Sequence, residues 1–322
     1  MKFKDSKIGK MIKNSQFSSY SGIILVIIVA CVFMNFRSEN FLTPNNILNI
    51  LRQISVYGIL ACGMAFAMMT GGIDLTVGSV AGVSGAVVAL LVTNEYLPLI
   101  PAMIVSLILG AIMGLISGFI ISRTGIPPFI MTLGMQITLR GTCYLICEGK
   151  PIGNLPDDLV NLGLGDIGGI PVPIFFMVGS FIIVGIILAR TSFGRTVYAT
   201  GGNYQAAFHS GINAKRVIMM AYMISGICAA LAGIILTARN ASAQPTAGNT
   251  FETEAIAACA MGGVSFNGGK GAVVGIFFGA LLMGIINNAM NLMYISSYWQ
   301  QVVKGIVIIG SVLYSIYNSK KN

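Results

Sequence analysis

The chain has 322 residues, a mean hydropathy of +0.84 and a formal net charge of +9, and only 9% of its residues are charged. This apolar composition excludes a soluble protein and indicates an all-α polytopic membrane protein. The 40 glycines agree with that class, because glycine lets membrane helices approach closely. The positive charge does not indicate a nucleic-acid partner, because the basic residues gather in segments that the positive-inside rule places in the cytoplasm.

The chain begins with a lysine-rich segment, residues 1–19, which we expect to be a cytoplasmic tail. The apolar run that follows continues past Cys31, and further apolar runs come after it. The sequence therefore predicts an uncleaved first membrane helix rather than a signal peptide. We expect the transmembrane domain to cover 20–318 and a short cytoplasmic tail to cover 319–322. All six cysteines lie in apolar runs and are interpreted as small packing residues.

Apolar runs long enough to cross a hydrocarbon core of about 30 Å recur along the chain, and we expect about ten membrane helices. A short amphipathic helix, capped at Thr43–Asn46, is expected to lead into the second span. The run Glu252–Phe266 is barely long enough to cross and is expected either to span or to re-enter. The expected spans are approximately 20–36, 54–70, 77–93, 98–122, 127–147, 171–189, 217–237, 252–266, 272–290 and 298–317.

Three connections differ in composition. The loop 148–170 is rich in acids, prolines and glycines and is expected to be extracytoplasmic, as is Arg239–Thr250. The segment 190–216 holds four basic residues and no acid, and is expected to be cytoplasmic. Within it, Asn203 as N-cap and Gly211 as the left-handed C-terminal residue predict a short helix. Residues with small side chains form one face of this helix: Asn203, Ala206, Ala207 and Ser210.

The second face of this short helix is an apolar stripe formed by Tyr204, Phe208 and Ile212 at helical spacing. A short helix that is small on one face and apolar on another suits the groove of a partner protein. The alternative is an interfacial helix that lies on lipid.

A polar, glycine-rich interruption, Gly71–Ser79, separates two apolar runs that are too close together for an ordinary loop. Backbone that leaves helical geometry at membrane depth must be buried in protein or line a wet cavity. Asp74 is the one acid in this interruption and is therefore a functional candidate. Its other interpretation, compatible with the first, is that Asp74 caps the following helix.

A second interruption, Gly262–Lys270, aligns without gaps on the first and is expected on the same side of the membrane. Paired glycine-rich interruptions in the two halves of a carrier indicate a translocation path through a discontinuous, internally repeated core. We expect the path to be lined by residues that are small or polar: Gly71, Gly72, Asp74, Thr76, Ser79, Gly262, Gly263, Asn267, Asn287 and Asn288.

No catalytic, metal or cofactor site is expected. Gly269–Lys270 departs from a phosphate-binding loop, because Val264 stands at the first glycine position and Gly271 follows the lysine in place of Ser or Thr. His209 is the only histidine, so the chain cannot assemble a histidine-based metal site or triad. The uncharged polar residues expected in the spans suit a neutral, hydroxyl-rich solute, and they also suit hydrogen bonding between helices.

Three motifs carry a resemblance to a known family. They read GGIDLTVGS at 71–79, GGNYQAAFHSGI at 201–212 and GGVSFNGGKG at 262–271. Together with TSFGR at 191–195, they resemble the permease subunit of bacterial ABC sugar importers, the branch that handles ribose, xylose and galactose. The resemblance covers about residues 41–317.

This resemblance implies a multi-pass protein of the bacterial cytoplasmic membrane with both termini in the cytoplasm. The implied partners are a second permease copy or paralogue, a cytoplasmic ABC ATPase and an extracytoplasmic sugar-binding protein. ATP hydrolysis then belongs to the ATPase, so the chain is not expected to be an enzyme. The alternative is a secondary carrier or facilitator that needs no ATPase. The residues that match the family's ATPase-coupling region are Gly202, Asn203, Ala206, Ala207, Ser210 and Gly211.

Overall fold

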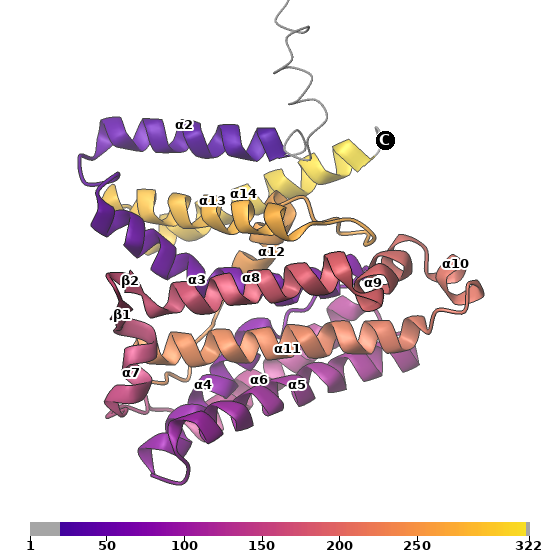
Figure 1. The fold of residues 1–322 in the computed structure, drawn as a ribbon, viewed down its shortest axis with the longest axis horizontal. Coiled ribbons are helices and arrows are strands. Elements are labelled where there is room, and N and C mark those ends of the chain that lie inside the picture. The colour runs from indigo at the N-terminus through magenta and orange to yellow at the C-terminus, as the bar shows by residue number, and fades with distance from the viewer. Residues whose placement is uncertain (1–19, 320–322) are drawn as a thin grey trace, which may run out of the picture.

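The computed structural model describes residues 20–319, so the expected tail 1–19 and nearly all of the expected tail 319–322 lie outside the described residues. Helices dominate the fold, and the two short strands pair as one antiparallel hairpin (Figure 1). The elements are α2 (Ser21–Arg37), α3 (Pro44–Met69), α4 (Val77–Thr93), α5 (Leu99–Thr124), α6 (Pro128–Ile146), α7 (Asp157–Leu164), β1 (Asp166–Ile167), β2 (Ile170–Pro171), α8 (Val172–Arg190), α9 (Ser192–Gly202), α10 (Tyr204–His209), α11 (Ala214–Arg239), α12 (Phe251–Met261), α13 (Val273–Leu292) and α14 (Ser297–Ser319).

Six helices among the described residues are long and apolar enough to cross a membrane, namely α3, α5, α6, α8, α11 and α13. The apolar helices α2 and α4 have 17 residues each. Helix α12 has only 11 residues. At about 1.5 Å per residue it covers about half of a 30 Å hydrocarbon core. The run 252–266 therefore does not cross as one helix, and the expectation of about ten membrane helices is not confirmed.

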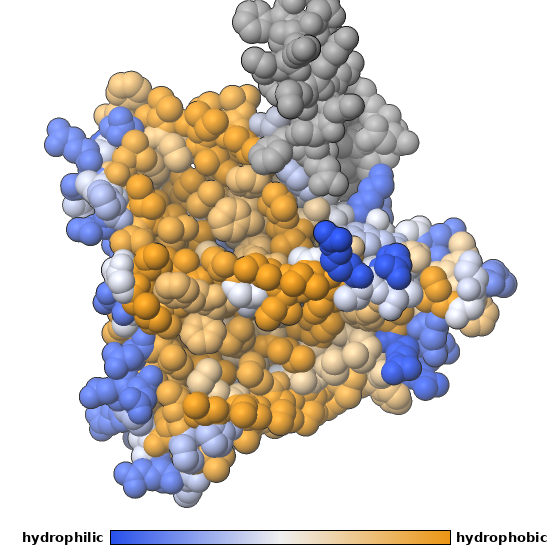
Figure 2. Space-filling model, in the orientation of Figure 1, coloured by the Kyte–Doolittle hydropathy of each residue, from blue (hydrophilic) through white to orange (hydrophobic). Residues whose placement is uncertain are grey.

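Apolar side chains cover the middle of the visible face as a broad band, with polar side chains at both ends (Figure 2). The connection with α7, β1 and β2 lies at one end, and α10 protrudes at the other (Figure 1). Helix α5 shows how the sequence makes this band. Large apolar side chains that recur every four residues on one face are all exposed: Ile104, Ile108, Ile112 and Ile116.

Helix α3 lies at the centre of the fold. The sequence predicted a short amphipathic helix that runs into the second span, and the structure has one continuous helix of 26 residues there. The Thr43 side chain caps it by accepting from the Asn46 backbone N–H at 3.4 Å, and Pro44 occupies the first turn. Nearly every residue from Ile54 to Met69 is buried, because the helix packs against α8, α11, α12 and α13.

Helices α5 and α11 are in close backbone contact. Gly110, Gly114 and Gly118 recur every four residues and so share one face of α5. A Cβ atom at Gly114 would overlap the carbonyl oxygen of Tyr222, and one at Gly226 would overlap the carbonyl oxygen of Gly110. Small residues at such a contact favour helix association in a membrane, because they allow extensive van der Waals packing.

The segment Arg239–Thr250, expected to be an external loop, partly enters the protein. Its Ala243 exchanges two backbone hydrogen bonds with Ile152, at 2.8 and 2.9 Å. Farther along, Gly248 is buried against the backbone of Gly78 near the start of α4. A non-helical segment at this depth agrees with the rule that such backbone must be enclosed by protein.

We expect Gly114→Val to destabilise the protein, because the new side chain would push α5 away from α11. Overpacking of this kind costs typically about 1–3 kcal/mol. Thermal unfolding of the purified protein in detergent measures the effect. Gly134→Val is the matched control, since no atom lies within 4 Å of a Cβ at that position. Equal unfolding temperatures for the two variants would show that α5 and α11 do not need this close contact.

Candidate functional site

Helix α10 has the termini that the sequence predicts. The Asn203 side chain accepts from the Ala206 backbone N–H at 2.9 Å, which is an N-cap. Gly211 has a φ of 81° and ends the helix in the left-handed conformation. The backbone N–H of Ile212 then donates to the carbonyl oxygen of Ala207 at 3.0 Å, which satisfies one of the last carbonyl groups of the helix.

Most of the small residues predicted for ATPase coupling are on the surface. Exposure is high at Gly202, Asn203, Ala206, Ser210 and Gly211. Ala207 differs, because it is buried at 4% exposure. The predicted small face is therefore narrower than the sequence pattern indicated. Apolar side chains lie beside it, with Tyr204 38% and Phe208 59% exposed.

The segments on either side of this helix carry basic side chains. The four basic residues of the segment are all exposed, namely Arg190, Arg195, Lys215 and Arg216. Blue, hydrophilic side chains gather at this end of the molecule (Figure 2). The sequence analysis did not predict α9, an 11-residue helix just before α10, whose N-cap Thr191 accepts from the Gly194 backbone N–H at 3.1 Å.

Both glycine-rich interruptions meet the end of α9. The backbone N–H of Gly269 donates to the carbonyl oxygen of Met69 at 2.9 Å. A Cβ at Gly201 would overlap that same oxygen, and a Cβ at Gly268 would lie 2.9 Å from the Gly71 nitrogen. The interruptions thus lie on the same side, as the sequence predicts. We call this backbone contact of Met69, Gly71, Gly201, Gly268 and Gly269 the inner junction.

The other predicted residues of the interruptions differ in exposure. Gly71, Gly263 and Asn267 are exposed. Gly262 is buried against α13, where a Cβ would lie 2.6 Å from the Gly275 backbone. Gly72 is also buried, and a Cβ there would overlap the Tyr222 hydroxyl. These glycines therefore permit close packing as well as the turns.

Asp74 is fully buried and uses both carboxylate oxygens within the protein. Its Oδ1 accepts from the Thr76 backbone N–H at 3.0 Å and from the Thr76 hydroxyl at 2.5 Å. Its Oδ2 accepts from the Ser225 hydroxyl at 2.6 Å. Asp74 thus orders the backbone that enters α4 and attaches it to α11. The N-cap of α4 is Thr76 and no side chain caps this helix, so the interpretation of Asp74 as its cap is wrong. Asp74 instead accepts from the residue two positions on, and neither of its oxygens is free for a solute in this conformation.

A second polar cluster joins α4, α6 and α12. The Ser79 hydroxyl donates to the backbone carbonyl of Gln136 at 3.0 Å, and the Gln136 side-chain amide donates to Glu252 Oε1 at 3.0 Å. Nearby, the Arg140 guanidinium donates to the carbonyl oxygens of Pro245 and Ala247, at 3.3 and 2.5 Å. Arg140 therefore stabilises the non-helical backbone before α12 and does not extend outward.

Asn287 and Asn288, the last two residues predicted for the path, are buried in α13. The amides of Asn288 and Asn46 exchange two hydrogen bonds, at 2.8 and 3.0 Å. The two asparagines lie about 20 Å along α13 from the helix start that follows the second interruption. The predicted path residues thus form separate groups at the inner junction, around Asp74, and near the far end of α13, rather than one pocket.

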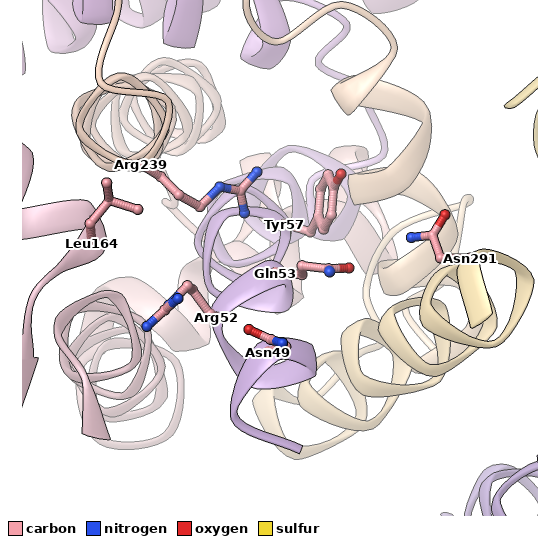
Figure 3. Close-up of a pocket in the computed structure, with 7 residues that line it drawn as sticks. All are labelled: Asn49, Arg52, Gln53, Tyr57, Leu164, Arg239 and Asn291. Atoms are coloured by element: carbon pink, nitrogen blue, oxygen red, sulfur yellow. The ribbon is translucent and has the colours of Figure 1, made fainter. Parts of the chain in front are cut away.

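The structure contains a polar pocket that the sequence analysis missed. It has a volume of about 340 Å³ and is lined by Asn49, Arg52, Gln53, Tyr57, Leu164, Arg239 and Asn291. Figure 3 shows Arg239 reaching toward α3 from α11, with Asn291 facing Gln53 and Tyr57 from α13. We call these residues the outer pocket. The sequence did contain a pattern that could have indicated this pocket, because its polar residues on α3 recur at helical spacing. The prediction for this segment rested only on the apolar residues of the same turns.

Comparison with known proteins identifies related permeases. Residues 46–312 match the family described as "Branched-chain amino acid transport system / permease component". The chain is 44% identical over 305 residues to the ribose import permease protein RbsC of Haemophilus influenzae, covering 94% of each chain. It is 39% identical over 296 residues to the D-allose transport system permease protein AlsC of Escherichia coli, covering 92% of this chain and 91% of that one. No solved structure matches.

A third relative is the L-arabinose transport system permease protein AraH of Escherichia coli. It is 36% identical over 306 residues, which cover 92% of this chain and 90% of the relative. The matches extend over nearly the whole length of each protein, so the similarity is not restricted to one motif.

The hydrogen bonds of Asp74 lead to a double-mutant prediction. Asp74→Ala should lower the free energy of unfolding by about 1.5–3 kcal/mol, the usual range for hydrogen bonds to charged groups. Asp74→Asn should cost less, because its amide oxygen still accepts from Thr76 and its NH₂ can donate to the Ser225 hydroxyl. Unfolding in detergent, measured for Asp74→Ala, Ser225→Ala and the double variant, gives the coupling. Additive losses would contradict the Asp74–Ser225 bond.

Proposed function

Because the chain belongs to the family of permease components that matches residues 46–312, we propose that it is the membrane-spanning subunit of an ABC importer for a monosaccharide. The observation that carries this assignment is the near full-length similarity to ribose, allose and arabinose permeases. The family description names branched-chain amino acids, but these sugar permeases match more of the chain than the family model does. A neutral, hydroxyl-rich cargo also suits the uncharged amides and hydroxyls inside the fold.

An importer of this class divides its tasks among subunits. ATP is hydrolysed by a separate cytoplasmic ATPase, and a substrate-binding protein delivers the cargo. The geometry at Lys270 agrees with this division. The loop before it packs against the inner junction, where the Gly269 backbone N–H already donates to Met69 and is not available for a phosphate.

We assign α10 to the ATPase contact. It protrudes at one end of the molecule and exposes both small and apolar side chains, and the segment 190–216 that contains it carries four exposed basic residues. A short exposed helix of this kind fits a groove in a partner protein. Because α9 connects α10 to the inner junction, a displacement of α10 by the ATPase would act directly on the ends of α3 and α12. This side is then cytoplasmic, and the connection with α7 and the hairpin faces the binding protein.

The path itself is proposed to follow the two interruptions. A second permease copy, in the same bilayer, would complete the pore beside Gly71, Gly263 and Asn267, which are exposed in the single chain. The buried residues Asp74, Thr76 and Ser79 hold the discontinuous helices in position rather than contact the solute in this conformation. Motion at the inner junction would open and close this path, since the interruptions meet there.

The function is tested by reconstituting the permease with its ATPase and binding protein in proteoliposomes. We expect uptake of a radiolabelled monosaccharide such as D-ribose that requires ATP, because the energy comes from the ATPase. Omission of the ATPase is the control and should abolish uptake. Uptake driven by a sodium or proton gradient without the ATPase would contradict the assignment and indicate a secondary carrier.

The ATPase contact makes a separate prediction. Ala206→Arg places a long cation on the exposed small face of α10, where it should prevent close contact with a groove. Sugar uptake and transport-coupled ATP hydrolysis should fall about tenfold or more, the effect of about 1.4 kcal/mol at a contact. The amount of permease in the membrane should not change, because Ala206 is exposed.

Thr124→Arg is the matched control, since it adds the same charge to an exposed position at the end of α5 on the same side of the molecule. This variant should transport normally. Assembly and transport by Ala206→Arg at the level of the control would show that α10 does not contact the ATPase.

A further inference from the structure

We propose that the outer pocket is a binding site for one monosaccharide, which it receives at the end of the molecule opposite α10. The inference rests on the proposed function and adds a site within it. The pocket has a volume of about 340 Å³, within the range of about 300–1,000 Å³ for small-molecule sites. A second cavity shares Asn49 and Arg52 with it and extends to Asp166 in the hairpin. The second cavity therefore lies between the outer pocket and the hairpin end.

Helix α3 lines the outer pocket with polar side chains that have no hydrogen-bond partner in the described part of the protein. Asn49, Arg52, Gln53 and Tyr57 follow one another at helical spacing and line the same cavity. Within residues 20–319, no side chain of these four makes a hydrogen bond to the protein, and Arg52 Nε is both buried and unpaired. Burying polar groups without partners is costly. Asn49 is exposed, while Arg52, Gln53 and Tyr57 are half-buried. The desolvation cost therefore applies to Arg52 Nε, and a polar ligand in the cavity would give this group a partner.

The walls opposite α3 supply further donors. Arg239 reaches the pocket from the last turn of α11, and its buried Nη1 has no hydrogen-bond partner among the described residues. Asn291 in α13 accepts a hydrogen bond from the Gln300 amide at 2.9 Å through its Oδ1, which leaves its NH₂ group as a donor. The pocket thus collects donors from three helices around one cavity.

The donor and acceptor types favour a sugar over an anion. A sugar hydroxyl both donates and accepts, and the amides of Asn49 and Gln53 and the phenol of Tyr57 do the same. Two arginines alone would suit an anionic ligand. However, the neighbouring cavity contains the carboxylate of Asp166, which would repel an anion, and four uncharged polar side chains line the pocket together with the two guanidinium groups.

The pocket is also connected to the discontinuous part of the fold. The Tyr57 ring packs edge-on against the ring of Phe251, with centroids 4.9 Å apart. Phe251 is the first residue of α12, the short helix that ends at the second interruption. A sugar in the outer pocket would therefore contact a side chain that touches α12, and α12 leads from this site toward the inner junction.

A protection experiment on the complex of the permease with its ATPase tests binding directly. Gln53→Cys is introduced together with Cys31→Ser, since the other five native cysteines are buried. A membrane-impermeant thiol reagent is applied with and without D-ribose, in the absence of the binding protein. A site with a dissociation constant of about 1 mM is about 90% occupied at about 10 mM sugar, so labelling should slow about tenfold.

The control is Asn161→Cys, an exposed position on α7 near the same end, whose labelling rate D-ribose should not change. Inorganic phosphate serves as the anionic probe. Protection of Gln53→Cys by D-ribose alone supports the proposal. Protection by phosphate alone, equal slowing at both cysteines, or no protection by D-ribose overturns it. None of these labelling results requires transport. The binding proposal and the proposed function can therefore fail separately.

A second measurement separates binding from folding. The double variant Asn49→Ala/Gln53→Ala removes two amides from the pocket and should import sugar about tenfold more slowly. ATP hydrolysis stimulated by the binding protein should persist, so the ATP consumed per sugar imported should rise about as much. Ile47→Ala, an exposed position on the same helix, is the control. Parallel loss of hydrolysis and uptake, or normal uptake, would overturn the assignment.

Discussion

Every interruption of a membrane helix leaves backbone groups that lipid cannot satisfy, and this requirement determines the interior of the protein. The chain meets it in three ways. A carboxylate, Asp74, accepts the backbone N–H at the start of α4. A guanidinium, Arg140, donates to the carbonyl oxygens that precede α12. At the inner junction, backbone groups satisfy each other, as Gly269 does with Met69. The polar residues inside the spans are thus engaged mainly with the chain's own backbone.

The inner junction explains why small residues recur in segments far apart in sequence. Three stretches of chain, from the ends of α3 and α9 and from the loop after α12, approach at backbone distance. Side chains at Gly201 or Gly268 would separate them. A contact that depends on backbone proximity transmits displacement with little loss, because no flexible side chain lies between the moving segments. Under the proposed ATPase contact at α10, this junction would carry a displacement of α10 to the ends of α3 and α9.

The sequence predicted the membrane class, the caps of α10 and the common side of both interruptions, because these depend on local composition and spacing. It did not predict α9, because the short polar segment between two apolar runs gave no periodic pattern long enough to indicate a helix. The partners of Arg140 and Asn288 also could not be predicted. Each depends on a residue more than a hundred positions away, and only the packing of α3, α6 and α13 brings these groups together. The outer pocket was missed for the same reason, as its walls come from three helices.

The composition of α12 has a consequence for biosynthesis. This helix is short and carries two buried acids, Glu252 and Glu254, both in its first turn. Acids oppose insertion of a membrane helix, by at most about 2.5–3.5 kcal/mol at its centre. The stabilising partners of α12 are distributed along the chain, since Gln136 lies in α6 and Lys304, the ion-pair partner of Glu254, lies in α14. Because Lys304 is made after α12, the helix obtains its full set of partners only once α14 has been synthesised.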